Sequence, residues 1–598
     1  MAARRNSAPK GTSERFPGSL STRDGIRLTS QTVSCLPLVN DVLAKMRLRH
    51  FLSAYLPRPT RSPGIPYDAG IELLVRNILC AREPMYGVGD WAEEFAPDLL
   101  GLTTDQVKRL NDDRVGRCLQ KLFLADMSSL TLAVTAHVVR QFDVSLDELH
   151  NDSTTVTFHG RYEDAVAGAR VNGKKTRAIT YGHNKDHRPD LKQLLFILTA
   201  SQDGGVPLYF TAADGNGTDD QTHRTTWDLL CQLAGRPDFL YVADSKLATQ
   251  SNMEHLHRNG GRFITVLPRT RKEDRAFRER VRNGTVKWKS ILTRKNKKGR
   301  VTEEVFASQT PMLSKEGFPI HWLRSTRKAE QDRTTRQRAL DRAWEAFGEL
   351  RARLASPRTR FRTHAKVEEA AFKILDDTGT RPWVELRIYE FEDEEYRKIQ
   401  RGRLGPNSTF RRIARLRFDI EVEIRQDALE QETVQDGIFP VITNDPRLPV
   451  REVLAAYKRQ PVIEKRFSQL KSELVIAPVF LHNAGRVEAL LCVYFFALLT
   501  QTLIEREIRR KMDQKGVSSL PLYHENRASK RPTARRVMDA FGNVQRHLLQ
   551  QPGSRTPIEM VTDLSPLQKK ILALLDLPSR SFGRQSMAER LRTRSRDR

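Results

Sequence analysis

The spacing of hydrophobic positions changes along the chain and divides it into segments. Between residues 31 and 147 apolar residues recur every three to four positions, which predicts a helical N-terminal domain. From 148 to 268 the period drops to two and short apolar runs appear, which predicts an α/β segment. Its predicted strands are Thr155–Phe158, Leu194–Thr199, Val206–Thr211, Phe239–Ala243 and Arg262–Leu267, with helices over 219–234 and 247–259. The fourth strand is short and wholly apolar, so we expect it to be central in the sheet.

A large insertion separates the two parts of this predicted core. Residues 269–435 contain a helical stretch at about 327–377 and strand alternation at Trp383–Phe391 and Phe418–Ile424, which predicts a mixed α/β insertion domain. The core resumes over 436–515, with a strand at Asp436–Thr443 and a long helical region from Val450 to about Met512. We expect 1–30 to be a flexible basic arm and 516–598 to be a C-terminal helical region with a basic tail.

Charge narrows the class of partner. The 598 residues include 101 Lys plus Arg against 73 Asp plus Glu, a formal net charge of +28. A field of this sign favours binding to a polyanion such as nucleic acid. The excess is strongest between residues 269 and 300, where 14 Lys/Arg stand against three acids. Contact with DNA phosphate is one interpretation of that segment, through Lys295, Lys297 and Lys298 among others, and a merely solvated face is the alternative.

Cysteine usage and apolar runs indicate the compartment. The five Cys residues are far apart and form no CxxC pair, which excludes a disulfide scaffold and fits a reducing compartment. The first 30 residues lack the apolar core of a secretory leader. The longest apolar run, Ala489–Ile504, is shorter than the roughly 20 residues needed to span a bilayer. We therefore expect a buried core helix there, and a cytoplasmic protein without a membrane partner.

Three carboxylates stand out by their positions in this pattern. Asp152 lies at the first predicted strand, Asp244 follows the fourth, and Glu464 lies in the helix after the last strand. Carboxylates at such strand ends can converge on one pocket, and oxygen ligands without His or Cys suit Mg²⁺ or Mn²⁺. Two such ions about 4 Å apart would promote cleavage of a phosphodiester. The alternative is that these residues are helix caps and surface acids.

The helix that carries Glu464 has a heptad pattern. Tyr457, Glu464 and Lys471 are seven residues apart, so on one helix they would share a face with about 20° of drift per heptad. Such a face would let the acid bind metal while the hydroxyl and the ammonium hold phosphates. An ordinary packed helix using Ile463 and Phe467 explains the apolar residues but not the acid between them.

Several segments together resemble a known family. They are HNDSTTVTF, YGHNKDHRPDLKQLLF, YVADSKLAT, RFITVLPRTRKE and YKRQPVIEKRFSQLKSELVIAPVFL. They resemble the DDE transposases of bacterial insertion sequences, in the group with an RNase H-like core, a helical N-terminal domain and a Tyr-x2-Arg-x3-Glu-x6-Lys signature. The resemblance covers about 31–545. It implies that Asp152, Asp244 and Glu464 are the catalytic triad, which binds two Mg²⁺ or Mn²⁺ ions, and that Tyr457 and Lys471 belong to the signature.

The sequence departs from this signature at one position. Gln460 stands where the family has Arg; Arg459 is adjacent, but on a helix it points about 100° away. We treat Tyr457, Arg459, Gln460 and Lys471 as candidate DNA contacts. The gap of 220 residues between Asp244 and Glu464 agrees with the insertion domain that this group has.

The function implied is DNA transposition. The protein would bind the terminal inverted repeats of its element, cut the DNA at their ends and join the freed 3′ hydroxyl to target DNA, as a homodimer in the bacterial cytoplasm on the nucleoid. An aromatic residue of the insertion, Trp288 or Trp322, would stack on a flipped base, with core packing as the alternative. A nuclease of the same fold that does not join DNA and a catalytically inactive DNA-binding derivative are the rival functions.

Other polar residues carry weaker predictions. Lys246 is a candidate phosphate contact or a solvated side chain. His183 and His187 would bind a metal with Asp186 only on a helix, whereas Gly182 and Pro189 favour a loop. That loop is either structural or a DNA contact. Ser153 has no base beside it in the sequence pattern, so a nucleophilic serine is not supported.

Overall fold

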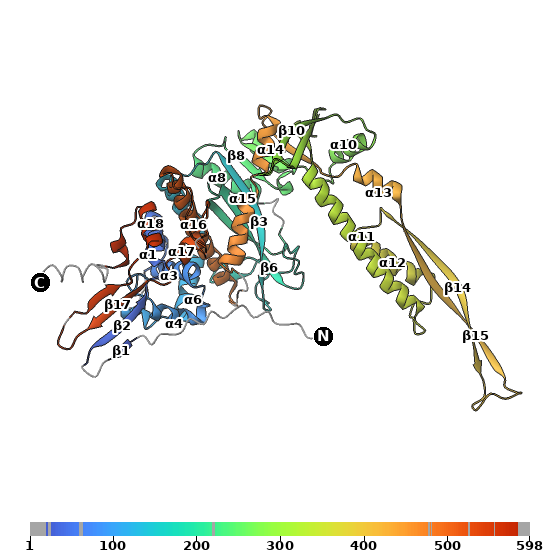
Figure 1. The fold of residues 1–598 in the computed structure, drawn as a ribbon, viewed down its shortest axis with the longest axis horizontal. Helices are drawn as coiled ribbons and strands as arrows, with labels where there is room; N and C mark the ends of the chain where they lie inside the picture. The colour runs from blue at the N-terminus through green and yellow to red at the C-terminus, as the bar shows by residue number, and fades with distance from the viewer. Residues whose placement is uncertain are drawn as a thin grey trace. The chain divides into compact units, whose positions relative to one another are not determined.

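The computed structural model describes residues 19–21, 25–58, 64–217, 222–476, 479, 481–523, 525, 527–554 and 556–583 (Figure 1). The chain forms two compact units. Unit 1 comprises Met1–Phe263 and Lys458–Arg598, and unit 2 is Ile264–Tyr457. The fold is mixed α/β with a large mixed sheet. The predicted insertion domain, 269–435, lies within unit 2.

Unit 1 begins with the predicted helical segment, and the helices are confirmed. They are α1 (Leu36–Lys45), α2 (Leu48–Tyr55), α3 (Tyr67–Cys80), η1 (Met85–Gly87), α4 (Val88–Glu94), α5 (Thr104–Val107), α6 (Asp112–Leu124) and α7 (Met127–Gln141). Local capping explains where some of them start. Asn111 accepts a hydrogen bond from the Arg114 N–H at the start of α6, and Asp126 accepts one from the Ser129 N–H at the start of α7.

The sheet of unit 1 follows the predicted strands closely. Its strands and helices are β3 (Glu148–Phe158), β6 (Lys192–Ser201), β7 (Pro207–Ala213), α8 (His223–Ala234), β8 (Leu240–Ala243), η3 (Ser245–Leu247), α9 (Gln250–Arg258) and β9 (Arg262–Val266), the strand on which the division between units falls. The order is β8-β3-β6-β7. β3 pairs antiparallel with β6 and parallel with β8, and β6 pairs antiparallel with β7. β4 (Arg170–Val171) and β5 (Lys174–Lys175) form a separate small hairpin.

The last part of the chain completes unit 1. α15 (Pro461–Ser468), the π-helix η4 (Gln469–Glu473) and α16 (Ala484–Gln514) are followed by α17 (Ala534–Asp539), β17 (Gln545–Gln550), β18 (Ile558–Val561), α18 (Pro566–Leu574) and η6 (Ser579–Phe582). α16 is long and apolar enough to cross a membrane, but 89% of its apolar window is buried against protein. It packs against α1, α3, α6 and β7, as expected of a core helix.

The sequence predictions for the two ends of the chain need correction. β2 (Arg27–Thr32) lies between β1 (Ser19–Ser21) and β17 in a four-stranded sheet that β18 completes, so residues 27–30 are not a flexible arm. The C-terminal region contains these strands as well as helices. Most of the predicted basic arm, residues 1–18, and the end of the predicted basic tail, residues 584–598, lie outside the described residues.

The region predicted to be helical from Val450 to about Met512 is mainly helical, but Tyr457–Lys471 is not one continuous helix. α14 (Val450–Tyr457) ends before α15 begins at Pro461, and the π-helix η4 then changes the helical period. Proline is tolerated at the first position of a helix but not inside one, so Pro461 explains the break. Tyr457, Glu464 and Lys471 therefore lie on three different elements, and the argument from one helix face does not hold.

Unit 2 has its own strands and helices. They are α10 (Lys272–Arg282), β10 (Trp288–Lys295), β11 (Val301–Ser308), β12 (Met312–Leu313), β13 (Pro319–Ser325), α11 (Thr326–Ala355), α12 (His364–Thr378), β14 (Val384–Lys398), β15 (Phe410–Ile424), α13 (Gln426–Thr433), β16 (Ile438–Thr443) and α14. The strand order is β10-β11-β13-β16-β9, with β12 on β13. β14 and β15 form a separate two-stranded ribbon, whose base packs against α11 and α12.

Candidate active site

Two of the three predicted carboxylates lie side by side in unit 1. The parallel strands β3 and β8 pair through Asn151 and Ala243. Asp152 and Asp244 occupy the next position on each strand, and neighbouring strands are about 4.8 Å apart. Asp152 is inside β3, whereas Asp244 directly follows β8 and caps η3, where its Oδ1 accepts the Lys246 N–H at 3.0 Å.

The environment of Asp152 disfavours its charged form. Its side chain is only 17% exposed. Burial raises the pKa of Asp152 to about 6, and the neighbouring Asp244 adds to this shift, while Lys185 and the Ser153 N–H oppose it. A carboxyl with a raised pKa beside a second carboxyl is typical of sites that bind cations or transfer protons, although structural networks also produce it.

A lysine that the sequence did not assign to the site contacts this pair. Lys185 Nζ lies 3.4 Å from Asp152 Oδ1 and donates to the Ser153 carbonyl at 2.7 Å. It lies on the 183–190 segment, which is a loop as predicted; the Asn184 amide oxygen accepts the Asp186 N–H there at 2.7 Å. Spacing along the chain showed a polar loop, but not that the loop returns to β3.

Glu464, the third predicted acid, is not shown to join the pair. Its side chain is exposed on α15. This helix packs against β3 and β6 of the same unit (Figure 1). Within the described residues, no group of three or more His, Cys, Asp or Glu is arranged to hold a metal ion. The structure therefore brings together Asp152 and Asp244, and the complete metal-binding triad stays a prediction.

A buried ionic network holds α15 in place. Glu505 of α16 is fully buried and accepts hydrogen bonds from Lys465 Nζ at 2.6 Å and Arg466 Nη1 at 3.3 Å. Arg509 lies 2.9 Å from the same carboxylate. Arg466 also donates to the carbonyl of Gly205, in the turn between β6 and β7, at 2.9 Å. Burial alone would raise the pKa of Glu505, but Arg466 and Arg509 outweigh it and lower the pKa.

The turn between β6 and β7 lies close against α15. Gly205 has φ +67, and a Cβ placed there would lie 2.6 Å from Val462 Cγ1. Glycine is therefore required both by the left-handed backbone and by the close approach of α15.

Two of the candidate DNA contacts, Arg459 and Lys471, form ion pairs within unit 1. Arg459 forms a two-pronged ion pair with Glu148, its Nε donating to Oε1 at 2.6 Å, and this hydrogen bonding raises the pKa of Arg459. The guanidinium of Arg459 thus has a partner on β3, and a DNA contact by Arg459 stays a prediction. Lys471 Nζ donates to Asp186 Oδ1 at 2.6 Å, which ties η4 to the loop that carries Lys185. Gln460 is half-buried at the start of α15.

The other candidates are distributed over both units. Lys246 is exposed beside Asp244. Tyr457 belongs to unit 2, where its ring lies 6.0 Å from that of Phe439. Lys295, Lys297 and Lys298 are exposed at the turn that joins β10 to β11, also in unit 2.

One of the two tryptophan candidates is excluded by burial. Trp322 is 1% exposed and its ring stacks on Phe277 at 4.0 Å, so it is a core residue and not available to a DNA base. Trp288 is half-buried and lines a cavity of about 410 Å³ with Phe306 and Arg324. Trp288 therefore stays a candidate.

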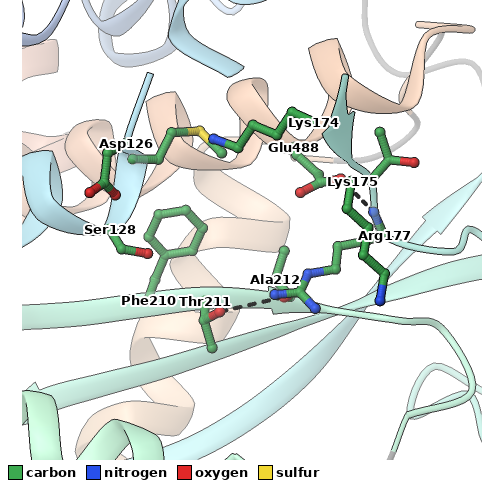
Figure 2. A pocket seen from close by; sticks show the side chains of 11 residues that line it. Asp126, Ser128, Lys174, Lys175, Arg177, Phe210, Thr211, Ala212 and Glu488 are labelled. Atoms are coloured by element: carbon green, nitrogen blue, oxygen red, sulfur yellow. Dashed lines mark hydrogen bonds between the residues drawn. The ribbon is translucent and has the colours of Figure 1, made fainter. Parts of the chain in front are cut away.

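Unit 1 has a charged pocket whose lining does not include the acid pair (Figure 2). It has a volume of about 300 Å³ and is lined by charged residues from β5, α16 and the segment after β5, among them Lys174, Arg177 and Glu488. Lys174 Nζ donates to the Phe123 and Ala125 carbonyls at 2.6 Å each, and Glu488 Oε1 accepts the Arg177 N–H at 2.6 Å. Burial lowers the pKa of Lys174 and raises that of Glu488. Lys174 and Glu488 thus hydrogen-bond to backbone groups, and these structural contacts account for the charged side chains in the pocket.

Comparisons with known proteins give limited matches. Residues 28–136 match a family described as a domain of unknown function, DUF4277. No curated protein matches. Among solved structures, the chain is similar to one described as a cryo-EM structure of the piggyBac transposase synaptic complex with hairpin DNA, at 11% identity and a TM-score of 0.25. That match covers 47% of this chain and 62% of the other, so it is a distant likeness to part of a transposase.

Proposed function

We propose that this protein is a DNA transposase with an RNase H-like core, which binds the ends of its element and catalyses metal-dependent cleavage and strand transfer. The observation that supports this best is the pairing of Asp152 with Asp244 on parallel neighbouring strands. The strand order is β8-β3-β6-β7, with one parallel and two antiparallel pairings, so the two acids lie on adjacent strands of a mixed sheet. The motifs that resemble DDE transposases include both acids.

The donor set fits a hard divalent cation. Asp152 and Asp244 offer carboxylate oxygens without His or Cys beside them, which suits Mg²⁺ or Mn²⁺. Lys185 Nζ now stands 3.4 Å from Asp152, so a positive charge already partly compensates this carboxylate. Glu464 would be the third oxygen ligand. Bound there, two ions would supply the Lewis-acid activation of phosphodiester hydrolysis and transesterification.

The rest of the site would hold and orient DNA. The buried contacts of Arg466 and Glu505 fix α15, so that Glu464 is carried by a rigid element. Lys471 and Lys246 are the cations of unit 1 that we propose for phosphate contacts, and Gln460 would add a neutral hydrogen bond. We further propose that two copies of the chain hold two element ends, on the bacterial nucleoid.

The direct test is cleavage of end DNA. The DNA that flanks this gene should contain inverted repeats, and labelled duplexes of these repeats should be nicked at the element end with Mg²⁺ or Mn²⁺ but not with EDTA. Cleavage without any preference for the repeat would favour a non-joining nuclease. Binding of the repeat without cleavage in either metal would favour an inactive DNA-binding derivative.

Two signature positions, Gln460 and Lys471, give a prediction that has its own control variant. Lys471→Ala should lower cleavage about 10- to 100-fold, because the variant has no ammonium to bind a phosphate, whereas Gln460→Ala should cost less than about tenfold. Gln460→Arg should be tolerated. Asp186→Asn is the control, since it removes the charged partner of Lys471 but leaves the ammonium. If Asp186→Asn were as damaging as Lys471→Ala, the ion pair itself and not a DNA contact would explain the effect.

The β10–β11 turn of unit 2 gives a second prediction. Changing Lys295, Lys297, Lys298 and Arg300 to Gln should weaken DNA binding and reduce the slope of log K against log salt by about 0.9 for each phosphate that the variant no longer neutralises. The turn itself should persist, because its backbone bonds involve Asn296, whose N–H donates to the Arg300 carbonyl at 2.9 Å. An unchanged slope would identify these side chains as a solvated face.

A further inference from the structure

The β14–β15 ribbon of unit 2 extends far beyond the core that supports it. Near its base, Val384, Phe418 and Ile420 are buried against α11 and α12. Past Phe418 both faces of the ribbon are largely exposed, and Figure 1 shows the strands continuing beyond α12. At about 3.3 Å per residue, strands of 15 residues reach roughly 50 Å. A two-stranded ribbon is marginally stable by itself, so an extension of this length indicates a binding role.

Charge along the ribbon is divided between its stem and its end. The strands of the stem are rich in acids, at Glu385, Glu390, Glu392, Asp393, Glu394, Glu395, Asp419, Glu421 and Glu423. The segment from Tyr396 to Arg412, called here the tip, has no acidic residue. Its cations are Arg397, Lys398, Arg401, Arg403, Arg411 and Arg412. The tip is therefore strongly positive and the stem negative.

Ion pairs differ between the two parts. In the stem, Arg417 Nε lies 3.2 Å from Asp393, and Arg415 lies 3.4 Å from Glu395. At the tip, Arg397 and Arg412 pair with the stem acids Glu395 and Glu394, each at 2.7 Å, while Arg411 lies directly opposite Arg397 in the register of the two strands.

The loop at the tip is ordered by its own hydrogen bonds. Lys398 Nζ donates to the Gly402 carbonyl at 3.0 Å, and the Ser408 N–H donates to the Gly405 carbonyl at 3.1 Å. Gly402 has φ +124, which only glycine adopts readily, and it separates Arg401 from Arg403 without a side chain between them. Leu404, 78% exposed, adds an apolar side chain beside these two arginines.

We propose that this tip binds double-stranded DNA, with Arg401 and Arg403 in the minor groove and Arg411 on a flanking phosphate. A narrow Arg-Gly-Arg loop with an apolar neighbour suits the minor groove, which is about 6 Å wide and attracts arginine. The acidic stem would repel phosphate and confine contact to the tip. This deepens the proposed function by naming a DNA contact in unit 2, and it rests on the chain acting on DNA.

The test compares two double variants of the full chain on the same duplex. Arg401→Gln with Arg403→Gln should weaken binding to A·T-rich duplex by about tenfold or more at 0.1 M salt and lower the salt slope. Netropsin, which fills the A·T minor groove, should weaken wild-type binding and affect this variant much less. Arg387→Gln with Arg415→Gln removes the same charge from stem residues paired to acids, and should change neither measurement.

Three outcomes would overturn the inference. They are unchanged affinity and slope in the tip variant, equal weakening in the stem control, and no binding of duplex by the wild type. Sedimentation of the same samples tests the other partner class: loss of a dimer without loss of DNA binding would assign the tip to a second copy of the chain. The failure of the proposed function is distinguishable, since a wild type that binds through the tip but never cleaves leaves this inference standing.

Discussion

Replacing Asp152 by Asn should lower end cleavage by about 10³-fold or more while leaving DNA binding nearly intact, because the metal ions would lack one carboxylate ligand. The same result is expected for Asp244→Asn and for Glu464→Gln. Cleavage at near wild-type rate by any one of the three would remove that residue from the site. Asp190→Asn is the matched control, since it neutralises an exposed acid paired with Arg188 in the neighbouring loop.

The fold should not suffer from the Asp152 change. Burial raises the pKa of Asp152 to about 6, well above the value of 3.8 expected for an exposed Asp. Its ionised form therefore costs free energy in the folded protein at pH 7, and this cost disappears in Asn. We expect Asp152→Asn to melt no lower than the wild type. A lower melting temperature together with abolished cleavage would indicate a structural role instead.

Replacing Glu505 by Ala should destabilise unit 1 by about 3–5 kcal/mol, because Arg466 would be left as a buried charge without its carboxylate. Arg466 is 2% exposed, so water cannot replace the missing partner. The measurement is the free energy of unfolding in denaturant, made with cleavage at a temperature where the variant is still folded. Cleavage should fall as well, since α15 carries Glu464.

The control for this prediction lies on the same helix. Glu507 pairs with Arg506 and Arg510, but Arg506 keeps Asp203 at 3.1 Å and the Phe142 carbonyl at 2.8 Å, so Glu507→Ala should cost only about 1 kcal/mol. If the two variants were equally stable, the network around Glu505 would not be what positions α15.

The sequence predicted the strands of unit 1 well because their patterns are local. β6 and β8 are nearly continuous apolar runs, and both proved buried over most of their length. β10 was missed, since its exposed Lys289, Arg294 and Lys295 hide the alternation within a segment that stood out only for its basic residues. β11 was missed because Glu303 and Glu304 interrupt its apolar pattern, although Glu303 is buried. β17 and β18 were missed because they are short and only half-buried.

The candidate site shows the same division between local and long-range information. The pattern put Asp152 at one predicted strand and Asp244 after another, and the resemblance to DDE transposases implied that they act together; the structure shows Asp152 inside β3 and not at its end. The pairing of Arg459 with Glu148 joins residues 311 positions apart, and no spacing rule indicates it. The contact between Lys185 and Asp152 depends likewise on how a loop returns to the sheet. Only the break at Pro461 had a visible signal, the proline itself.

Joining of a pre-cut element end to target DNA tests the central claim most directly. A labelled duplex with a free 3′ hydroxyl at the end of the inverted repeat would be incubated with wild-type protein, supercoiled plasmid and Mg²⁺ or Mn²⁺. The account predicts covalent joining of the labelled strand to the plasmid, absent with EDTA and absent in Asp152→Asn. Metal-dependent degradation of the DNA without any joined product, or joining that persists in Asp152→Asn, would contradict it.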